Sequence, residues 1–254
     1  MSNATPEKST SSWGYRLNVW LYQFSKNWLY VFLAVLGTYA TLPWVAPVLA
    51  NVGLTGPANA IYTIYSPMCH QLGFRSVWLG GDQLFYPREI VGVETIASYE
   101  DYAATIDAIN VGEAPDSFEP EFWLPARQFR GNETMGYKTA ICARDVAIYA
   151  AMFIGSLIYA IPYVRRRLRP IPILLYLVIG MGPIGIDGFS QLLSYPPFEF
   201  WDVRETAPFF RVATGAMFGL MNAWLALPYI EMSFADTRRQ LAEKFRKADL
   251  PIPQ

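Results

Sequence analysis

The sequence predicts an all-α membrane protein with four transmembrane helices, and both its composition and the spacing of its charges indicate this. Its 254 residues are 53% hydrophobic and only 16% charged, whereas soluble domains carry about 25% charged residues. The mean hydropathy of +0.19 agrees. The charges also occur in blocks, and none lies between Lys26 and Arg75.

Four stretches free of Asp, Glu, Lys and Arg are candidate spans, because a bilayer core takes about 20 helical residues. They are residues 28–50, 146–164, 170–186 and 212–230. The third is short and interrupted by Pro183 and several glycines. We therefore expect an irregular helix around residues 182–188, with Asp187 turned toward the bundle.

The distribution of basic residues predicts the orientation of the spans. Residues 1–26, 165–169 and 231–254 together hold 12 of the 20 Lys and Arg residues. Residues 75–145 and 187–211 hold 16 of the 21 acidic residues. Basic loops stay cytoplasmic, so the chain is expected to be a multi-pass protein of a prokaryotic plasma membrane with both termini in the cytoplasm.

This topology divides the chain into three parts. Residues 1–27 form a cytoplasmic segment whose aromatic residues recur at helical spacing, as in an interfacial amphipathic helix. Residues 28–234 form the membrane domain, including an outer-face insertion at 80–139. Residues 235–254 form a charged cytoplasmic tail helix.

Two further helices are expected on the outer side. Residues 58–72 are uncharged but contain several polar side chains. If they crossed the membrane, the later basic loops would face outward, so we expect a helix packed against the bundle or re-entrant. Residues 99–109 have the pattern of an amphipathic helix. The insertion is too small for an independent core, so it is expected to cap the bundle or to bind other subunits of a membrane complex.

The rarest residue types fall on the outer side. Cys69, His70, Cys142 and Asp187 supply the donor types of a tetrahedral zinc site, and iron would also accept them. Two alternatives remain open. Cys69 and Cys142 could form a disulfide, which an oxidising compartment permits, or both could be buried free thiols beside a hydrogen-bonded histidine. The sulfur–sulfur distance separates these cases: about 3.5–4 Å for a shared metal, about 2.05 Å for a disulfide.

Three arginines are expected at the same surface. Arg75, Arg144 and Arg211 would together form a pocket for an anionic group such as a lipid phosphate. Asp145 is placed to cap the second span.

Several functions are excluded or disfavoured by the sequence. A net charge of −1 argues against nucleic-acid binding. The GxGxxG pattern at residues 180–185 lies inside a span without a preceding strand, so it does not indicate a nucleotide site. The absence of CxxCH excludes a covalently attached c-type haem. No charged residue lies at mid-membrane depth, which argues against an ion-coupled transporter.

The motifs resemble a known family. They are Cys69-His70-Gln71, Arg75-Ser76, Cys142-Ala143-Arg144-Asp145, Asp187-Gly188, Gln191, and Arg211 with Thr214-Gly215. In this order they resemble the prokaryotic membrane family called domain of unknown function 2085, over residues 60–79 and 140–225. The resemblance implies that the motif residues share one site, and it brings no activity with it. The insertion at 80–139 departs from the more compact family pattern.

Two hypotheses of function follow. The first is a metalloprotein of the outer membrane face that holds zinc or iron and acts on or binds an anionic or lipid-linked ligand. The alternative is an accessory subunit of a respiratory or photosynthetic complex, in which the cysteines form a disulfide or a structural metal site.

Overall fold

The structure is a computed structural model that describes residues 13–109 and 120–253. Within these residues its elements are α1 (Trp13–Asn51), α2 (Thr55–Tyr65), η1 (Gly73–Arg75), β1 (Ser76–Leu79), η2 (Glu89–Val91), α3 (Tyr99–Ala103), α4 (Pro120–Gln128), β2 (Gly131–Asn132), β3 (Gly136–Cys142), α5 (Ala143–Ala160), α6 (Pro162–Arg167), α7 (Ile173–Leu175), η3 (Tyr176–Met181), α8 (Gly182–Leu192) and α9 (Pro208–Lys247).

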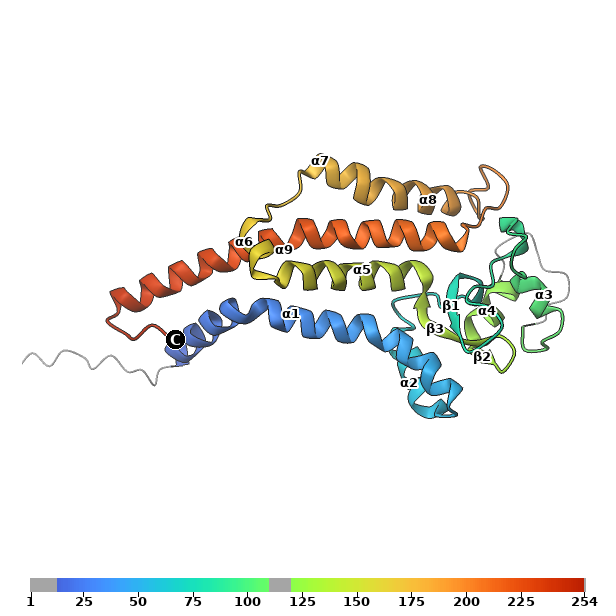
Figure 1. Cartoon of the computed structure of the whole chain (residues 1–254), viewed down its shortest axis with the longest axis horizontal. Helices are drawn as coiled ribbons and strands as arrows, with labels where there is room; N and C mark the ends of the chain where they lie inside the picture. Colours follow the sequence, from blue (N-terminus) through green and yellow to red (C-terminus); the bar gives the residue numbers. More distant parts are fainter. Residues whose placement is uncertain (1–12, 110–119, 254) are drawn as a thin grey trace, which may run out of the picture.

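Four helical segments in the described residues are long and apolar enough to cross a membrane. They are α1, α5, the continuous stretch Ile173–Leu192 and α9. Figure 1 shows them side by side along the long axis, with α9 between α5 and α8. The four predicted spans are therefore confirmed as helices. The prediction of an all-α fold is wrong in one respect, because the chain also forms a three-stranded antiparallel sheet in the order β1-β3-β2.

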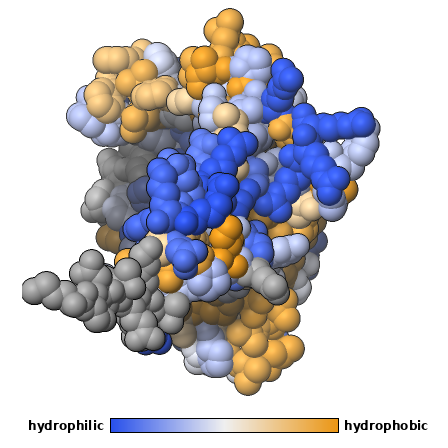
Figure 2. Space-filling model, turned by 90° about the vertical axis from the view of Figure 1, so that its left-hand side faces the viewer, coloured by the Kyte–Doolittle hydropathy of each residue, from blue (hydrophilic) through white to orange (hydrophobic). Residues whose placement is uncertain are grey.

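The two ends of the bundle differ. At one end, the start of α1 and the end of α9 meet, where the ring of Tyr15 packs edge-on against Phe245. The arginine-rich α6 also lies at this end (Figure 1). Viewed from this end, hydrophilic residues form a broad band with hydrophobic residues above and below it (Figure 2). The sheet, α2, α3 and α4 form a cap at the opposite end (Figure 1).

The packing of α5 against α9 depends on two glycines. A Cβ on Gly215 would overlap the carbonyl oxygen of Arg144, and one on Gly219 would overlap that of Ile148. The Gly-x-x-x-Gly spacing thus lets the two backbones approach closely, as small residues do between membrane helices. This contact fixes the first two turns of α5 beside residues 215–219 of α9.

The helix predicted at residues 58–72 is shorter in the structure. α2 ends at Tyr65, because Pro67 has no backbone N–H with which to continue the helical hydrogen bonds. Ala58, Ile61 and Tyr62 of α2 are buried in a cluster with residues of α1 and β3. Residues 68–72 leave α2 as an irregular segment.

The cap has a hydrophobic cluster to which the insertion and the residues before it both contribute. The cluster is built around Trp78, Tyr86 and Phe122, all buried. The helix predicted at 99–109 is limited to α3, because Ile106 and Ile109 turn back into this cluster.

The third span is irregular, but one turn earlier than expected. Residues Tyr176–Met181 are π-helical, whereas α8 is regular from Gly182. Pro183 has no backbone N–H for the carbonyl of Ile179, which favours a shift of the hydrogen-bond register in the preceding turn. Asp187 on α8 is buried, as expected from the sequence.

Lys138 of β3 joins α4 to the segment that follows α2. Its ammonium group is fully buried and donates to the carbonyl oxygens of Gln71 at 2.6 Å, Ala126 at 2.9 Å and Arg127 at 2.8 Å. Burial lowers the pKa of Lys138 well below its ordinary value. The three acceptors therefore replace the water that this cation would otherwise require.

We expect Lys138→Met to destabilise the protein by at least about 2 kcal/mol, because three buried carbonyls would lose their donor. Thermal unfolding in detergent measures the change. Lys247→Met makes the same change at an exposed position on α9 and is the control. Equal unfolding temperatures for the two variants would contradict the structural role of Lys138.

Candidate metal and anion site

The register of the sheet brings the two cysteines together. Ser76 of β1 pairs with Cys142, the last residue of β3, and β3 runs directly into α5. The segment that precedes β1 carries Cys69. This segment is fixed by α2 at one end and by β1 at the other. Cys69 therefore lies beside the first turn of α5.

Gln71 holds this segment in place. Its backbone is in the left-handed region with φ 53°, which is uncommon for a residue other than glycine. Its buried side-chain amide donates to the carbonyl oxygens of Tyr62 at 2.8 Å and Ala140 at 2.7 Å. Strained conformations of this kind persist where the surroundings fix them, often at functional sites.

Cys69, Cys142 and Asp145 form a compact donor group. One ligand atom from each, two sulfurs and a carboxylate oxygen, lies within 4.8 Å of the other two. Cys142 Sγ is 3.1 Å from Asp145 Oδ2. Both cysteines are free thiols, so the structure does not contain the disulfide considered from the sequence.

The two thiols have different environments. The sulfur of Cys69 accepts hydrogen bonds from the backbone N–H groups of Cys142 at 3.2 Å and Gln71 at 3.5 Å, whereas the Cys142 thiol donates to Asp145 at 3.1 Å. The neighbouring Cys142 thiol and these backbone donors lower the pKa of Cys69. The neighbouring Cys69 sulfur, together with burial, raises the pKa of Cys142. Cys69 is therefore the more acidic of the two thiols.

Two residues predicted as metal ligands lie outside this group. His70 is exposed and lines the same cavity as the cysteines. Asp187 is held instead by Arg144 and Arg204, and it also accepts a hydrogen bond from Thr206 at 2.8 Å. Its carboxylate is therefore committed to an ion pair, and Asp145 is the acid beside the cysteines. The spacing Cys142-x-x-Asp145 places both side chains on one helix face and could have indicated this from the sequence.

The predicted arginines converge, but each has an acidic partner. Glu205, whose side chain is 2% exposed, binds both Arg75 and Arg211. Asp187 binds Arg144 and, at 3.1 Å, Arg204. The sequence did not identify these partners, because they meet only where the acidic loop after α8 folds back and brings Glu205 between Arg75 and Arg211. We call these two arrangements the arginine–carboxylate triads.

The triads carry excess positive charge, since each has two guanidinium groups and one carboxylate. Burial alone would raise the pKa of Glu205, yet Arg75 and Arg211 hold it below its ordinary value. Although burial opposes its charged form, Glu205 raises the pKa of Arg75. Glu205 and Arg75 therefore form an ion pair at neutral pH.

The donor group and the triads share one cavity. It has a volume of about 270 Å³, and the residues that line it include Cys69, His70, Cys142 and Asp145 together with Arg75, Arg144 and Arg211. The Nε atom of Arg144 is buried and has no hydrogen-bond partner within the protein. A small anionic group in the cavity would find both a cationic wall and this free donor.

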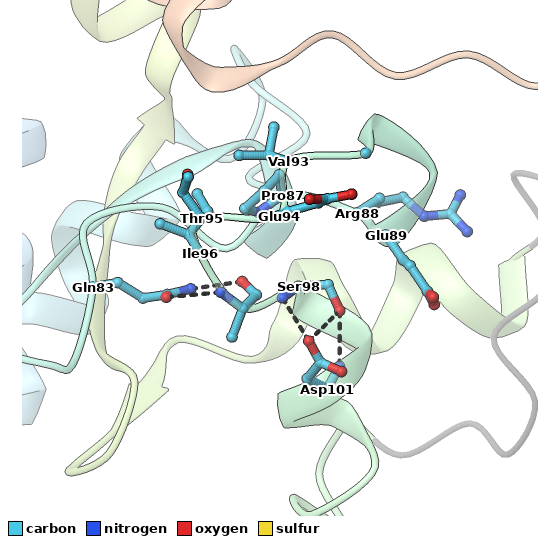
Figure 3. A pocket seen from close by; sticks show the side chains of 12 residues that line it. Gln83, Pro87, Arg88, Glu89, Val93, Glu94, Thr95, Ile96, Ser98 and Asp101 are labelled. Carbon is cyan, nitrogen blue, oxygen red and sulfur yellow. Dashed lines mark hydrogen bonds between the residues drawn. The ribbon is translucent and has the colours of Figure 1, made fainter.

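A larger pocket in the cap, of about 560 Å³, is a weaker candidate. Figure 3 shows that its polar side chains bind neighbouring groups: Gln83 with the backbone of Ala97, and Ser98 with Asp101. The latter pair is the capping box of α3. The described residues that line this pocket include neither cysteine nor histidine, so it lacks the donors that distinguish the smaller cavity.

Comparison with known proteins identifies a family that matches part of the chain. Residues 125–225 match the DUF2085 family, described as predicted membrane proteins. The resemblance inferred from the motifs is confirmed for this segment. The matched residues contain Cys142, Asp145 and both triad carboxylates, whereas Cys69 and Arg75 precede them.

An uncharacterized protein of Methanocaldococcus jannaschii, MJ1492, is 31% identical over 113 residues. The alignment covers 44% of this chain and 64% of that relative. No solved structure matches the chain.

Glu205→Gln should destabilise the protein by about 3–5 kcal/mol, because it leaves two buried guanidinium groups without their counterion. The pKa of Glu205 is lowered in the folded state, so this stabilisation is present at neutral pH and is lost as the pH falls through the folded pKa. Thermal unfolding in detergent at neutral pH is the measurement.

The control for this experiment is Glu199→Gln, which changes an exposed glutamate of the same loop. If both variants unfold at the same temperature, Glu205 does not hold the triad together.

Proposed function

We propose that this chain is a membrane metalloprotein in which Cys69, Cys142 and Asp145 bind zinc beside a cavity for an anionic ligand. The observation that carries the proposal is the donor group: three ligand atoms of the types that zinc prefers lie within 4.8 Å of one another. Their separation suits a shared ion, for which sulfur–sulfur distances of about 3.5–4 Å are expected. Iron would accept the same donors.

Charge supports a further ligand. Two thiolates and the Asp145 carboxylate would leave a zinc ion with one excess negative charge, whereas the two triads carry two excess positive charges. One additional anion would balance the cavity. Three protein donors also leave a fourth zinc position for water, for this anion, or for His70, which lines the same cavity.

An open position of this kind is the arrangement of catalytic zinc sites, in which the metal activates water or polarises a bound group. A fourth protein ligand would instead make the ion structural. The number of protein donors in the loaded site therefore determines whether the protein can act on its ligand.

The proposed orientation puts the site outside the cell. The ends of α1 and α9 and the arginines of α6 lie together at one end of the bundle. The cap and the cavity lie at the other end (Figure 1). Basic segments remain on the cytoplasmic side, so we place both termini in the cytoplasm of a prokaryotic cell and the cavity at the outer face of the plasma membrane.

Purified protein should contain about one zinc ion per chain, and Cys142→Ser should lose it, because the remaining donors cannot complete the site. Elemental analysis under reducing conditions measures the metal. Asp145→Asn should weaken binding in a chelator titration, whereas Asp202→Asn, at an exposed position of the same end, should not.

Other results would contradict the proposal. Stoichiometric iron without zinc would show that the site binds iron instead of zinc. A metal-free protein whose Cys69 and Cys142 are joined by a reducible bond would support the disulfide interpretation. A metal-free protein that purifies within a larger complex would support the accessory-subunit hypothesis and its interaction through residues 80–139.

Reporter fusions test the orientation. A fluorescent protein fused after Gln254 should be active, since this side is expected to be cytoplasmic. Alkaline phosphatase inserted near Asp116, which lies outside the described residues, should be active because it requires export. Phosphatase activity at the C-terminus would reverse the orientation and move the cavity to the cytoplasmic face.

A further inference from the structure

An apolar groove lies on the flank of the bundle between α1 and α2. It has a volume of about 500 Å³, and Val35 and Leu42 of α1 and Ile64 of α2 are among the residues that line it. Val35 is 66% exposed and Ile64 is 63% exposed. Val35 is on the surface of a candidate membrane span, where hydrocarbon rather than water is the expected neighbour, and Ile64 of α2 extends this apolar surface.

The groove meets the metal and anion cavity at Met68. This residue lines both, and the next residue is Cys69 of the donor group. Its side chain is 67% exposed, and its sulfur accepts a hydrogen bond from Tyr39 at 3.4 Å. A flexible thioether is therefore the boundary between an apolar surface and a polar cavity.

The two spaces differ in the chemistry they would accept. The groove offers almost only apolar contacts, whereas the cavity is lined by Arg75, Arg144 and Arg211 of the triads, which carry excess positive charge. A ligand that fits both has a hydrocarbon tail joined to an anionic head. Arginine pairs well with phosphate, to which it can donate two parallel hydrogen bonds.

We propose that the ligand of the site is an anionic phospholipid, with its acyl tail in the α1–α2 groove and its phosphate in the cavity beside Cys69 and Arg144. This assignment rests on the proposed membrane orientation and deepens the proposed function, because it names the class of ligand. Lateral entry past Met68 would bring the head group to the proposed zinc ion directly from the bilayer.

The test compares lipid contact at two positions of the full-length protein. A photocrosslinking amino acid replaces Val35 in the groove or, as the control, Ile186, an exposed residue of α8 at the same end of the bundle. Each protein is reconstituted in phosphatidylcholine vesicles that contain tagged phosphatidylglycerol or tagged phosphatidylcholine with identical acyl chains.

We expect the Val35 position to label with phosphatidylglycerol about fivefold more than with phosphatidylcholine, relative to the same ratio at Ile186, because the cavity has about one uncompensated positive charge. Equal ratios at the two positions would show ordinary boundary lipid and overturn the proposal. Met68→Trp should abolish the preference by blocking the boundary while the zinc content stays unchanged.

The outcome is independent of the metal assignment. A protein that binds zinc but shows no anionic preference at Val35 would overturn the lipid proposal alone. A protein that shows the preference but binds no metal would overturn the zinc proposal and leave the lipid site in place. If Met68→Trp keeps the full preference, the groove and the cavity do not act as one site.

Discussion

A carboxylate buried between two guanidinium groups holds the cap end of this bundle together. Glu205 comes from the loop before α9, Arg75 from the segment before β1, and Arg211 from the first turn of α9. A buried carboxylate is tolerated only when it is paired. The loop, the cap and α9 must therefore keep one relative position, and this position defines the wall of the cavity.

The second triad extends the same constraint to α5 and α8. Asp187 of α8 binds Arg144, in the first turn of α5, and Arg204 of the loop. Arg144 is also the residue whose carbonyl faces Gly215 of α9. The close contact between α5 and α9 and the ionic contact between α5 and α8 thus fix the helix turn that carries Cys142 and Asp145. The donor group depends on packing that lies outside it.

The same arrangement holds the two thiols together at the cap end of the bundle. The segment with Cys69 is fixed by the side chain of Gln71 and by the ammonium group of Lys138, which both bind backbone carbonyls. A preorganised donor group loses less entropy when it binds a metal than a mobile one would. In the proposed lipid site, the adjoining arginines would attract the anionic head group and the apolar groove would hold the acyl tail.

The sequence by itself determined the four apolar helices, the separation of basic from acidic segments, and the resemblance to the family that residues 125–225 match. These features depend on composition over about 20 residues, which local sequence records directly. The sequence also brought Cys69 and Cys142 to one end of the bundle. It did so because the number of spans fixes the side on which each loop emerges.

The tertiary structure alone decided which side chains meet. It placed Asp145 rather than Asp187 beside the cysteines, and it supplied Glu205 as the partner of Arg75 and Arg211. Several of these contacts join residues far apart in the sequence, as between Cys69 and Cys142 or Arg75 and Glu205, and no local periodicity encodes them. They follow from the strand register at Cys142, the glycine contact between α5 and α9, and the requirement that every buried charge be paired.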